Sequence, residues 1–376
     1  MIFFDSASTT PLHPEVLKTY NYILENYYAN SDSLYNTGVK INHLLEQSRE
    51  QIAKMLKVKD DEIIFTSGAS ESNNMLVKGI AFAYQHKGKH LITSNIEHSS
   101  ISGAFKQLQE VFGFEVTYVP VDENGKVNPE VLKKALRKDT TLVSIMAVNN
   151  ESGSINDLKA LSKVIKEHSN AYFHSDCTQA LGKEDIPMNC LDAASFSAHK
   201  IYGCKGSGFL YKRANIQIVP IINGGQQEYG LRGGTSNHPC HIVLAKTLRL
   251  TLESKQAHYD HVKHLNELMK RELNHMDDII INSPSDATPY ILNFSCTCMT
   301  SEILLNALNE REIYVSAKST CHSKTRSVST VLLAMGIDEK RASQAIRVSF
   351  SHLNNESEVY EFIKNLKEIL NDYRIK

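Results

Sequence analysis

Short apolar runs of strand length alternate with segments of helical periodicity along the first 200 residues of the chain. The segment "EIIFTSGASESNNMLVKGIAFAY" reads as a strand, a glycine-containing turn and a helix, and "HLITSNIEHSSISGAFKQL" repeats this order. Residues 142–148 are almost continuously apolar, as strands covered by helices on both faces require. In residues 41–56 apolar side chains recur at helical spacing, which predicts a packed helix. This alternation is typical of an α/β fold with a mostly parallel central sheet flanked by helices.

The pattern changes near residue 220, where "IINGGQQEYGLRGGTSNHP" is polar, rich in glycine and typical of a functional loop. A long charged helix is expected after it, over about residues 240–275. The rest of the chain alternates strands and helices, which predicts a smaller α+β domain. We therefore expect a large domain over 15–255 and a small domain built from 1–14 and 256–376. Within the latter, we expect "CTC" at 296–298 to continue a strand and its two thiols to face opposite sides.

Composition narrows the class of protein. The chain has 376 residues, 22% of them charged, and a formal net charge of −1, which gives no reason to expect nucleic acid or an anionic membrane as a partner. No apolar run reaches the roughly 18 residues of a membrane-spanning helix. The N-terminus meets Asp5 without a basic start, so no signal peptide is expected. Seven scattered cysteines without zinc-ligand spacing favour a reducing cytoplasm over a disulfide framework or a structural metal.

Polar clusters follow five of the predicted strands, at residues 67–70, 97–98, 149–151, 176–179 and 197–200. In open parallel sheets, ligands bind at the carboxyl ends of the strands. We therefore expect the five clusters to form one pocket.

Each cluster has an ordinary structural explanation when it is considered alone. Small residues at 67–70 suit a phosphate at a helix N-terminus, but they also suit a plain helix cap. Asp176 after a buried strand needs a partner, which could be a pyridinium nitrogen or a basic side chain. Lys200 is either a snorkelling lysine or an amine held for Schiff-base chemistry. Together with His98 as a ring-stacking group, these features indicate a pyridoxal phosphate site.

Several motifs in order then resemble one family. They are "FFDSASTTP", "FTSGASESNN", "ITSNIEHSSI", "VSIMAVNNESG", "FHSDCTQALGK", "SFSAHKIYGCKG", "LRGGTSN" and "SFS" after Arg347. The chain resembles the cysteine desulfurases of the NifS/IscS type, among the class V aminotransferases of the fold-type I pyridoxal phosphate enzymes. The resemblance covers nearly the whole chain. It implies pyridoxal 5′-phosphate as the cofactor, L-cysteine as the substrate, a homodimer and a protein that accepts sulfur.

The resemblance also implies roles for individual residues. Lys200 would form the Schiff base with the cofactor and move the Cα proton, and His98 would stack on the ring. Asp176 would pair with the ring nitrogen, and Gln179 would bond the phenolic oxygen. The substrate carboxylate would be bound by Asn149 and Arg347. The phosphate would be held by Ala69, Ser70, Ser197 and His199, together with Thr235 of the neighbouring subunit.

The resemblance places the persulfide-carrying cysteine at Cys321, in the polar stretch "VSAKSTCHSKTRS". Its basic surroundings favour a thiolate, although an incidental exposed cysteine is the plain alternative. The loop departs from the usual "SGSAC", because Lys318 stands where glycine is usual. Cys204 replaces a usual proline and is expected to pack.

Other functions stay open on the sequence. A selenocysteine lyase or another class V aminotransferase would share the pocket, and Cys321 favours the desulfurase. A non-catalytic scaffold would not need Lys200, Asp176, His98 and Arg347 together. A nucleotide-binding enzyme is disfavoured, because none of the glycine-containing stretches follows a strand in GxGxxG or GxxxxGK[ST] form.

Overall fold

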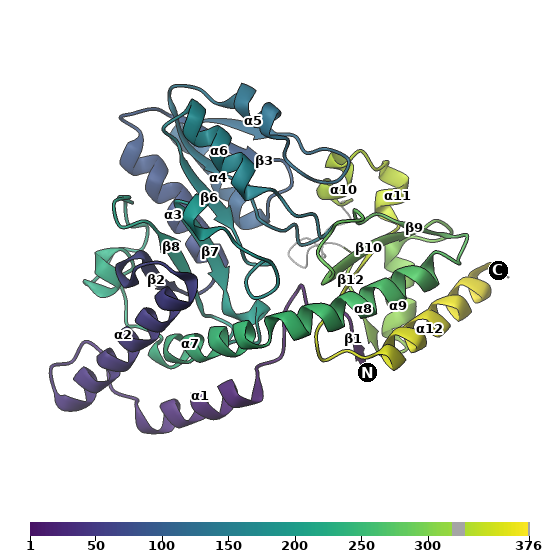
Figure 1. The fold of residues 1–376 in the computed structure, drawn as a ribbon, viewed down its shortest axis with the longest axis horizontal. Coiled ribbons are helices and arrows are strands. Elements are labelled where there is room, and N and C mark those ends of the chain that lie inside the picture. The colour runs from purple at the N-terminus through teal and green to yellow at the C-terminus, as the bar shows by residue number, and fades with distance from the viewer. Residues whose placement is uncertain (318–327, 375–376) are drawn as a thin grey trace.

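The computed structural model describes residues 1–317 and 328–374, and Cys321 lies outside this part of the chain. A seven-stranded sheet forms the centre of the larger lobe, in the order β2-β8-β7-β6-β5-β3-β4 (Figure 1). The last five strands in this order are parallel, and β8 is antiparallel to both of its neighbours. The strands are β2 (Ile63–Thr66), β3 (His90–Ser94), β4 (Glu115–Val119), β5 (Thr140–Ser144), β6 (Tyr172–Asp176), β7 (Ala193–Ser197) and β8 (Gly208–Lys212).

Helices cover both faces of this sheet. On one face, Met75 and Ile80 of α3 share an apolar cluster with Phe105 of α4. On the other face, the cluster takes in Ile52 of α2 and Leu248 of α7, together with side chains of α6. The helices of this lobe are α1 (Pro14–Asn26), α2 (Asn36–Leu56), α3 (Ala69–Tyr84), α4 (Ser99–Phe112), α5 (Pro129–Ala135), α6 (Leu158–His168) and α7 (His238–Glu253). The predicted α/β fold with a mostly parallel, covered sheet is confirmed.

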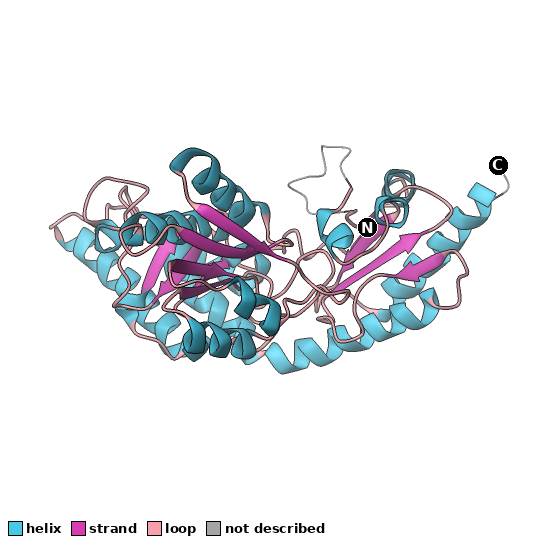
Figure 2. Cartoon of the chain, turned by 90° about the horizontal axis from the view of Figure 1, so that it is seen from above, coloured by secondary structure: helices cyan, strands magenta, loops and turns pink. Residues whose placement is uncertain are grey.

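A second, smaller sheet lies beside the first and has its own apolar core (Figure 2). It is antiparallel, in the order β12-β10-β9, and a separate pair, β1 with β11, joins the N-terminus to this lobe. Its elements are β1 (Ile2–Phe3), α8 (Lys255–Leu273), β9 (Ile279–Ile281), β10 (Ile291–Cys296), α9 (Ser301–Asn309), β11 (Ile313–Tyr314), α10 (Thr330–Ala334), α11 (Glu339–Ser343), β12 (Ala345–Ser349) and α12 (Glu356–Arg374). This arrangement supports the proposed division into 15–255 and 1–14 with 256–376.

Two local predictions are wrong. The long charged helix is two helices, because Ser254, with φ −100° and ψ 1°, leaves helical geometry between α7 and α8. The second error concerns "CTC". The strand β10 ends at Cys296, and a turn closed by Met299 N–H donating to the Cys296 carbonyl (3.4 Å) follows. The expectation also had a wrong premise, because side chains two residues apart along a strand point to the same face. In the structure the two sulfur atoms lie 3.5 Å apart.

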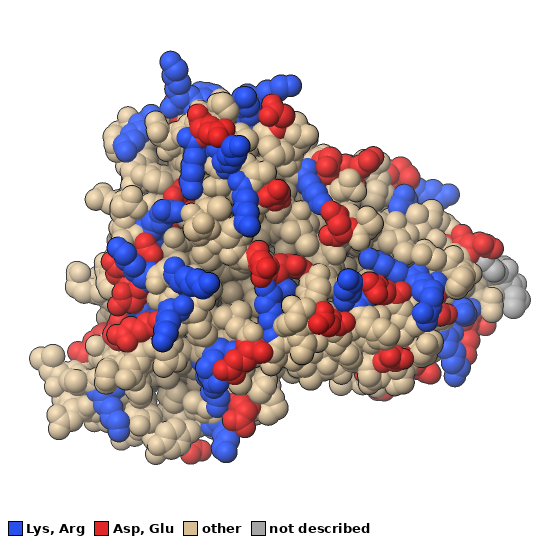
Figure 3. All heavy atoms as spheres, in the orientation of Figure 1, with Lys and Arg blue, Asp and Glu red and all other residues tan. Residues whose placement is uncertain are grey.

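Basic and acidic side chains are interspersed over the face of the molecule seen in Figure 3, in line with the net charge of −1. Within residues 1–317 and 328–374, no helix is both long and apolar enough to cross a bilayer.

Candidate active site

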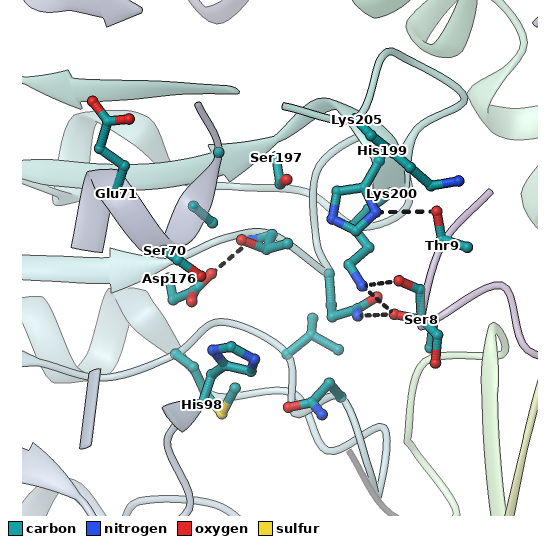
Figure 4. Close-up of a pocket in the computed structure, with 18 of the residues that line it drawn as sticks. Ser8, Thr9, Ser70, Glu71, His98, Asp176, Ser197, His199, Lys200 and Lys205 are labelled. Atoms are coloured by element: carbon teal, nitrogen blue, oxygen red, sulfur yellow. Dashed lines mark hydrogen bonds between the residues drawn. The ribbon is translucent and has the colours of Figure 1, made fainter. Parts of the chain in front are cut away.

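A cavity of about 460 Å³ lies at the carboxyl ends of the large sheet's parallel strands, where the smaller lobe meets it (Figure 4). Nine of the residues predicted for the site line it: Ala69, Ser70, His98, Asp176, Gln179, Ser197, His199, Lys200 and Arg347. The expectation that several strand ends share one pocket is thereby confirmed. The N-terminal residues 7–9 close the cavity on the side opposite the sheet.

Lys200 ends a single 3₁₀ turn, Ala198–Lys200, that follows β7 directly. Its amine donates hydrogen bonds to the carbonyls of Ala7 and Ser8, both at 2.6 Å (Figure 4). The N-terminal segment is tied to this turn, because Thr10 N–H donates to the His199 carbonyl at 2.9 Å. The amine therefore points into the cavity and not into bulk solvent.

Asp176 ends β6, the strand next to β7, and only 5% of its surface is exposed. The Asn73 amide donates to one carboxylate oxygen at 2.7 Å, and the Thr178 backbone N–H donates to the other at 3.0 Å. Among the described residues, no lysine or arginine forms an ion pair with it. A buried carboxylate held in this way is suited to a cationic group inside the cavity.

A concave backbone surface forms where α3 begins. Gly68 precedes the helix with φ 145°, a conformation that side chains disfavour. Gly208 crosses so closely that a Cβ there would lie 2.6 Å from the Gly68 Cα. The first N–H groups of a helix have no partner within it, so those of Ala69 and Ser70 suit an anion.

Both acidic and basic side chains lie around this concave surface. Burial would raise the pKa of Glu71, but hydrogen bonds from Arg232 (2.8 Å) and the Ser67 N–H (2.9 Å) hold it below its usual value. Lys205 also lines the cavity. Burial, reinforced by the charge of Lys200, lowers the pKa of His199 to about 4. His199 is thus a neutral ring that can donate one N–H to a phosphate.

His98 caps the N-terminus of α4 and faces the cavity. Its Nδ1 accepts a hydrogen bond from the Ser100 N–H at 3.2 Å, which leaves the proton of the neutral ring on Nε2. The neighbouring Glu97 accepts from the Ser94 hydroxyl and from the Met146 N–H, and its second carboxylate oxygen has no partner among the described residues. Burial raises the pKa of Glu97 to about 8.

Arg347, on β12 of the smaller lobe, is 1% exposed and lines the cavity. Its Nη2 donates to an Asp5 carboxylate oxygen and to the Ser8 hydroxyl, each at 2.7 Å, and its Nη1 donates to the Asn150 carbonyl at 2.8 Å. Its Nε has no partner among the described residues. A fixed guanidinium whose Nε–H and second Nη1–H have no partner among these residues is well placed to bind a carboxylate.

Gln179 links the sheet to the N-terminal segment. Its amide N–H donates to the Ala7 carbonyl at 2.9 Å, and its carbonyl accepts from the Lys183 amine at 3.2 Å. Burial, with the nearby charge of Lys200, lowers the pKa of Lys183 to about 7.

Three predicted residues are not brought into this cavity. Asn149 is fully buried behind it, with its amide donating to the Ile96 carbonyl (3.1 Å) and accepting from the Glu151 and Ser152 N–H groups. Thr235 is exposed and does not line the cavity of its own chain. Cys321 lies outside the described residues.

Sequence reasoning assigned no individual role to other lining residues. Asn150 and Thr178 fall within the predicted clusters 149–151 and 176–179 and line the cavity, and the buried Thr178 hydroxyl has no hydrogen-bond partner among the described residues. Asn73, which holds Asp176, sits in the quoted motif "FTSGASESNN", and residues 7–9 sit in "FFDSASTTP". Those motifs were the available signal, but neither Asn73 nor residues 7–9 follow a strand end directly.

The residues present fit pyridoxal phosphate. The helix N-terminus with Ser197 and His199 suits its phosphate, the carboxylate of Asp176 suits its ring nitrogen, and the amine of Lys200 suits its aldehyde. The partnerless hydroxyl of Thr178 and the open backbone at Gly68 leave hydrogen-bonding capacity and room for such a group.

Comparisons with known proteins agree with this geometry. The family model described as aminotransferase class-V matches residues 2–362. A "NifS/IcsS protein homolog" of Lactobacillus delbrueckii subsp. bulgaricus is 42% identical, over 98% of this chain and 97% of the relative. A "Cysteine desulfurase IscS" of Dictyoglomus turgidum is 39% identical, over 99% of this chain and 95% of its own. A solved "NIFS-LIKE PROTEIN" superposes with a TM-score of 0.93 at 36% identity, covering 98% of this chain and 99% of that one.

Proposed function

The chain belongs to the aminotransferase class-V family as a cysteine desulfurase of the NifS/IscS type, and we propose that it uses pyridoxal 5′-phosphate held by the cavity residues. The observation that carries this proposal is the placement of the Lys200 amine and the Asp176 carboxylate. Asp176 ends β6, Lys200 ends the turn directly after the adjacent parallel strand β7, and both line one cavity. When bound, the cofactor would supply an aldehyde for amines and a ring that stabilises negative charge on the substrate.

The chain's own residues would hold and activate the reactants. Asp176 would keep the ring nitrogen protonated, because its buried charge favours the cation. The Lys200 amine, once released from the Ala7 and Ser8 carbonyls, would remove the proton from the substrate Cα. His98 would lie against the ring and could carry a proton on Nε2.

Substrate binding would depend on Arg347, whose guanidinium takes the carboxylate of L-cysteine. Its hydrogen bonds to Asp5, Ser8 and Asn150 fix the orientation of the guanidinium before the substrate binds. We propose Asn150 as the asparagine beside the substrate in preference to Asn149, whose buried amide is already hydrogen-bonded to backbone and side-chain groups of its neighbours.

Sulfur transfer would take place at Cys321. Its thiolate attacks the sulfur of L-cysteine, so an S–S bond forms on Cys321 while the C–S bond of the substrate breaks. The carbon takes up a proton and leaves as L-alanine, and the persulfide sulfur then passes to an acceptor protein.

We also propose a homodimer in the cytoplasm. Thr235 is exposed on its own chain, as a residue that reaches the neighbouring subunit's phosphate must be. Large apolar side chains near the glycine-rich loop that carries Thr235 are also exposed, with Tyr28 at 85% and Leu34 at 95%. The loop is anchored from within, because Glu228 accepts two hydrogen bonds from the buried Arg49, at 2.7 and 2.9 Å.

Two variants test the proposal. Lys200→Ala should lose the visible absorption band of the cofactor-loaded protein and all alanine formation. Cys321→Ala should keep the band but lose sulfide and alanine production from L-cysteine. A Cys321→Ala variant that releases sulfide at the wild-type rate would contradict sulfur transfer through this residue. A colourless wild type that does not take up added pyridoxal phosphate would favour the scaffold.

The selenocysteine lyase is separated by substrate. The desulfurase should form alanine from L-cysteine and transfer its sulfur to Cys321. An enzyme that acts on L-selenocysteine alone would be a lyase.

A further inference from the structure

Two cysteines that take no part in the active-site cavity lie together at the end of β10. Cys296 is the last residue of the strand and is fully buried, whereas Cys298 is half-buried. Their sulfur atoms are 3.5 Å apart. The sulfur atoms of a disulfide lie about 2.0 Å apart, so the two thiols are in contact and need to approach by roughly 1.5 Å to be joined.

The backbone around the pair is held in place from both sides. The Cys296 N–H donates to the Gln344 carbonyl at 3.1 Å, and the Gln344 side-chain amide donates to the Thr297 carbonyl at 2.8 Å. The Thr297 N–H donates to the Asp278 carbonyl at 2.8 Å. The turn is therefore fixed before any bond between the thiols forms, and closing it orders little additional chain.

The two thiols differ in a way that suits a stepwise reaction. Cys298 is accessible to a small reagent, whereas Cys296 is not. Burial, together with the neighbouring Cys298, raises the pKa of Cys296 to about 12. Once Cys298 has reacted, its contribution to this shift is lost, and Cys296 becomes the nearest nucleophile to the new bond.

We propose that Cys296 and Cys298 form a dithiol site that reacts with low-molecular-weight disulfides such as cystine. The Cys298 thiolate attacks one sulfur of cystine, forming a mixed disulfide and releasing one cysteine. The Cys296 thiol then gives up its proton and attacks the Cys298 sulfur, forming the Cys296–Cys298 disulfide and releasing the second cysteine. The protein loses two electrons and two protons, and cystine gains them.

The test uses the cofactor-loaded enzyme and peptide mapping. The protein is incubated with cystine, its remaining thiols are blocked with N-ethylmaleimide after denaturation, and it is digested with trypsin without reduction. Tryptic peptide 272–311 contains both Cys296 and Cys298 and no other cysteine. It should lack two hydrogens and carry neither N-ethylmaleimide nor a cysteinyl group.

Cys190 provides the matched control. Cys190 is half-buried like Cys298, and its thiol donates a hydrogen bond to the Asn189 side-chain carbonyl at 3.7 Å. It is the single cysteine of tryptic peptide 184–200. This peptide can acquire a cysteinyl group but cannot form an internal disulfide.

Two variants test the order of the steps. Cys296→Ser should retain a stable cysteinyl group on Cys298, and Cys298→Ser should leave Cys296 unreacted. The proposal is overturned if wild-type peptide 272–311 keeps two free thiols, whatever happens to Cys190, or if it stops at a cysteinyl adduct.

Discussion

The cavity has two walls that differ in how the chain builds them. One wall is the carboxyl edge of the large sheet, where Asp176, Ser197 and Lys200 follow neighbouring strands. The other wall comes from both ends of the chain, where residues 7–9 meet Arg347. The contact between Asp5 and Arg347 joins residues 342 positions apart.

The difference shows which contacts local pattern can reveal. Neighbouring parallel strands end at the same edge, so polar residues after them converge without further information. The second wall exists because β1 pairs with β11, and because Arg347 lies on a strand bonded to β10. The wall formed by the sheet carries the Asp176 charge that would face the cofactor. The wall formed by the two chain ends holds the Lys200 amine and Arg347 in position.

Removing the charge of the sheet wall should have the largest effect. In Asp176→Asn the carboxylate that faces the ring nitrogen becomes a neutral amide of the same size. Breaking a buried charge pair costs about 3–5 kcal/mol, so kcat/KM for L-cysteine should fall roughly a hundredfold to several thousandfold. Alanine formation measures the loss.

Asp192→Asn is the matched control on the same sheet. Asp192 accepts a hydrogen bond from the Phe173 N–H at 2.9 Å and pairs with Arg213, and it does not line the cavity. Equal losses in the two variants would show that the sheet needs the charge for folding and not for chemistry.

The sequence predicted the sheet wall well and the other wall only in part. Asp176 ends a short buried strand and Lys200 follows another, so their position at the edge of the sheet could be inferred. Residues 7–9 follow only a two-residue strand, and no local periodicity says where such a segment packs. The choice between Asn149 and Asn150 depends on how the turn after Val148 rotates each side chain, which hydrophobic pattern does not determine. The turn at Cys298 escaped prediction for the same reason.

Substitutions of the two adjacent asparagines should have different effects, one on substrate binding and the other on stability. Asn150→Ala removes a side chain at the substrate and should raise KM roughly tenfold while the protein stays as stable as the wild type. Asn149→Ala leaves three buried backbone groups unsatisfied and should lower the free energy of unfolding by about 2–3 kcal/mol. Denaturant unfolding and steady-state kinetics on both variants separate the effects. A large rise in KM confined to Asn149→Ala would restore that residue as the substrate ligand.

Lys183 connects the two walls and should give the smallest effect. It donates to Gln179, which in turn donates to the Ala7 carbonyl that also accepts from Lys200. Because the pKa of Lys183 is lowered to about 7, the residue is charged below neutral pH and neutral above it. Its positive charge disfavours protonation of the nitrogen of Lys200.

Lys183→Met should therefore shift the pH midpoint of the cofactor's visible band upward, by up to roughly one unit. Lys183→Arg carries a positive charge at every pH of the titration, so it should return the midpoint to the wild-type value or below it. Lys246→Met, near the surface beside Glu15, should leave the midpoint unchanged. If Lys183→Met has the wild-type midpoint, the link from Lys183 through Gln179 is structural, and the two walls act independently.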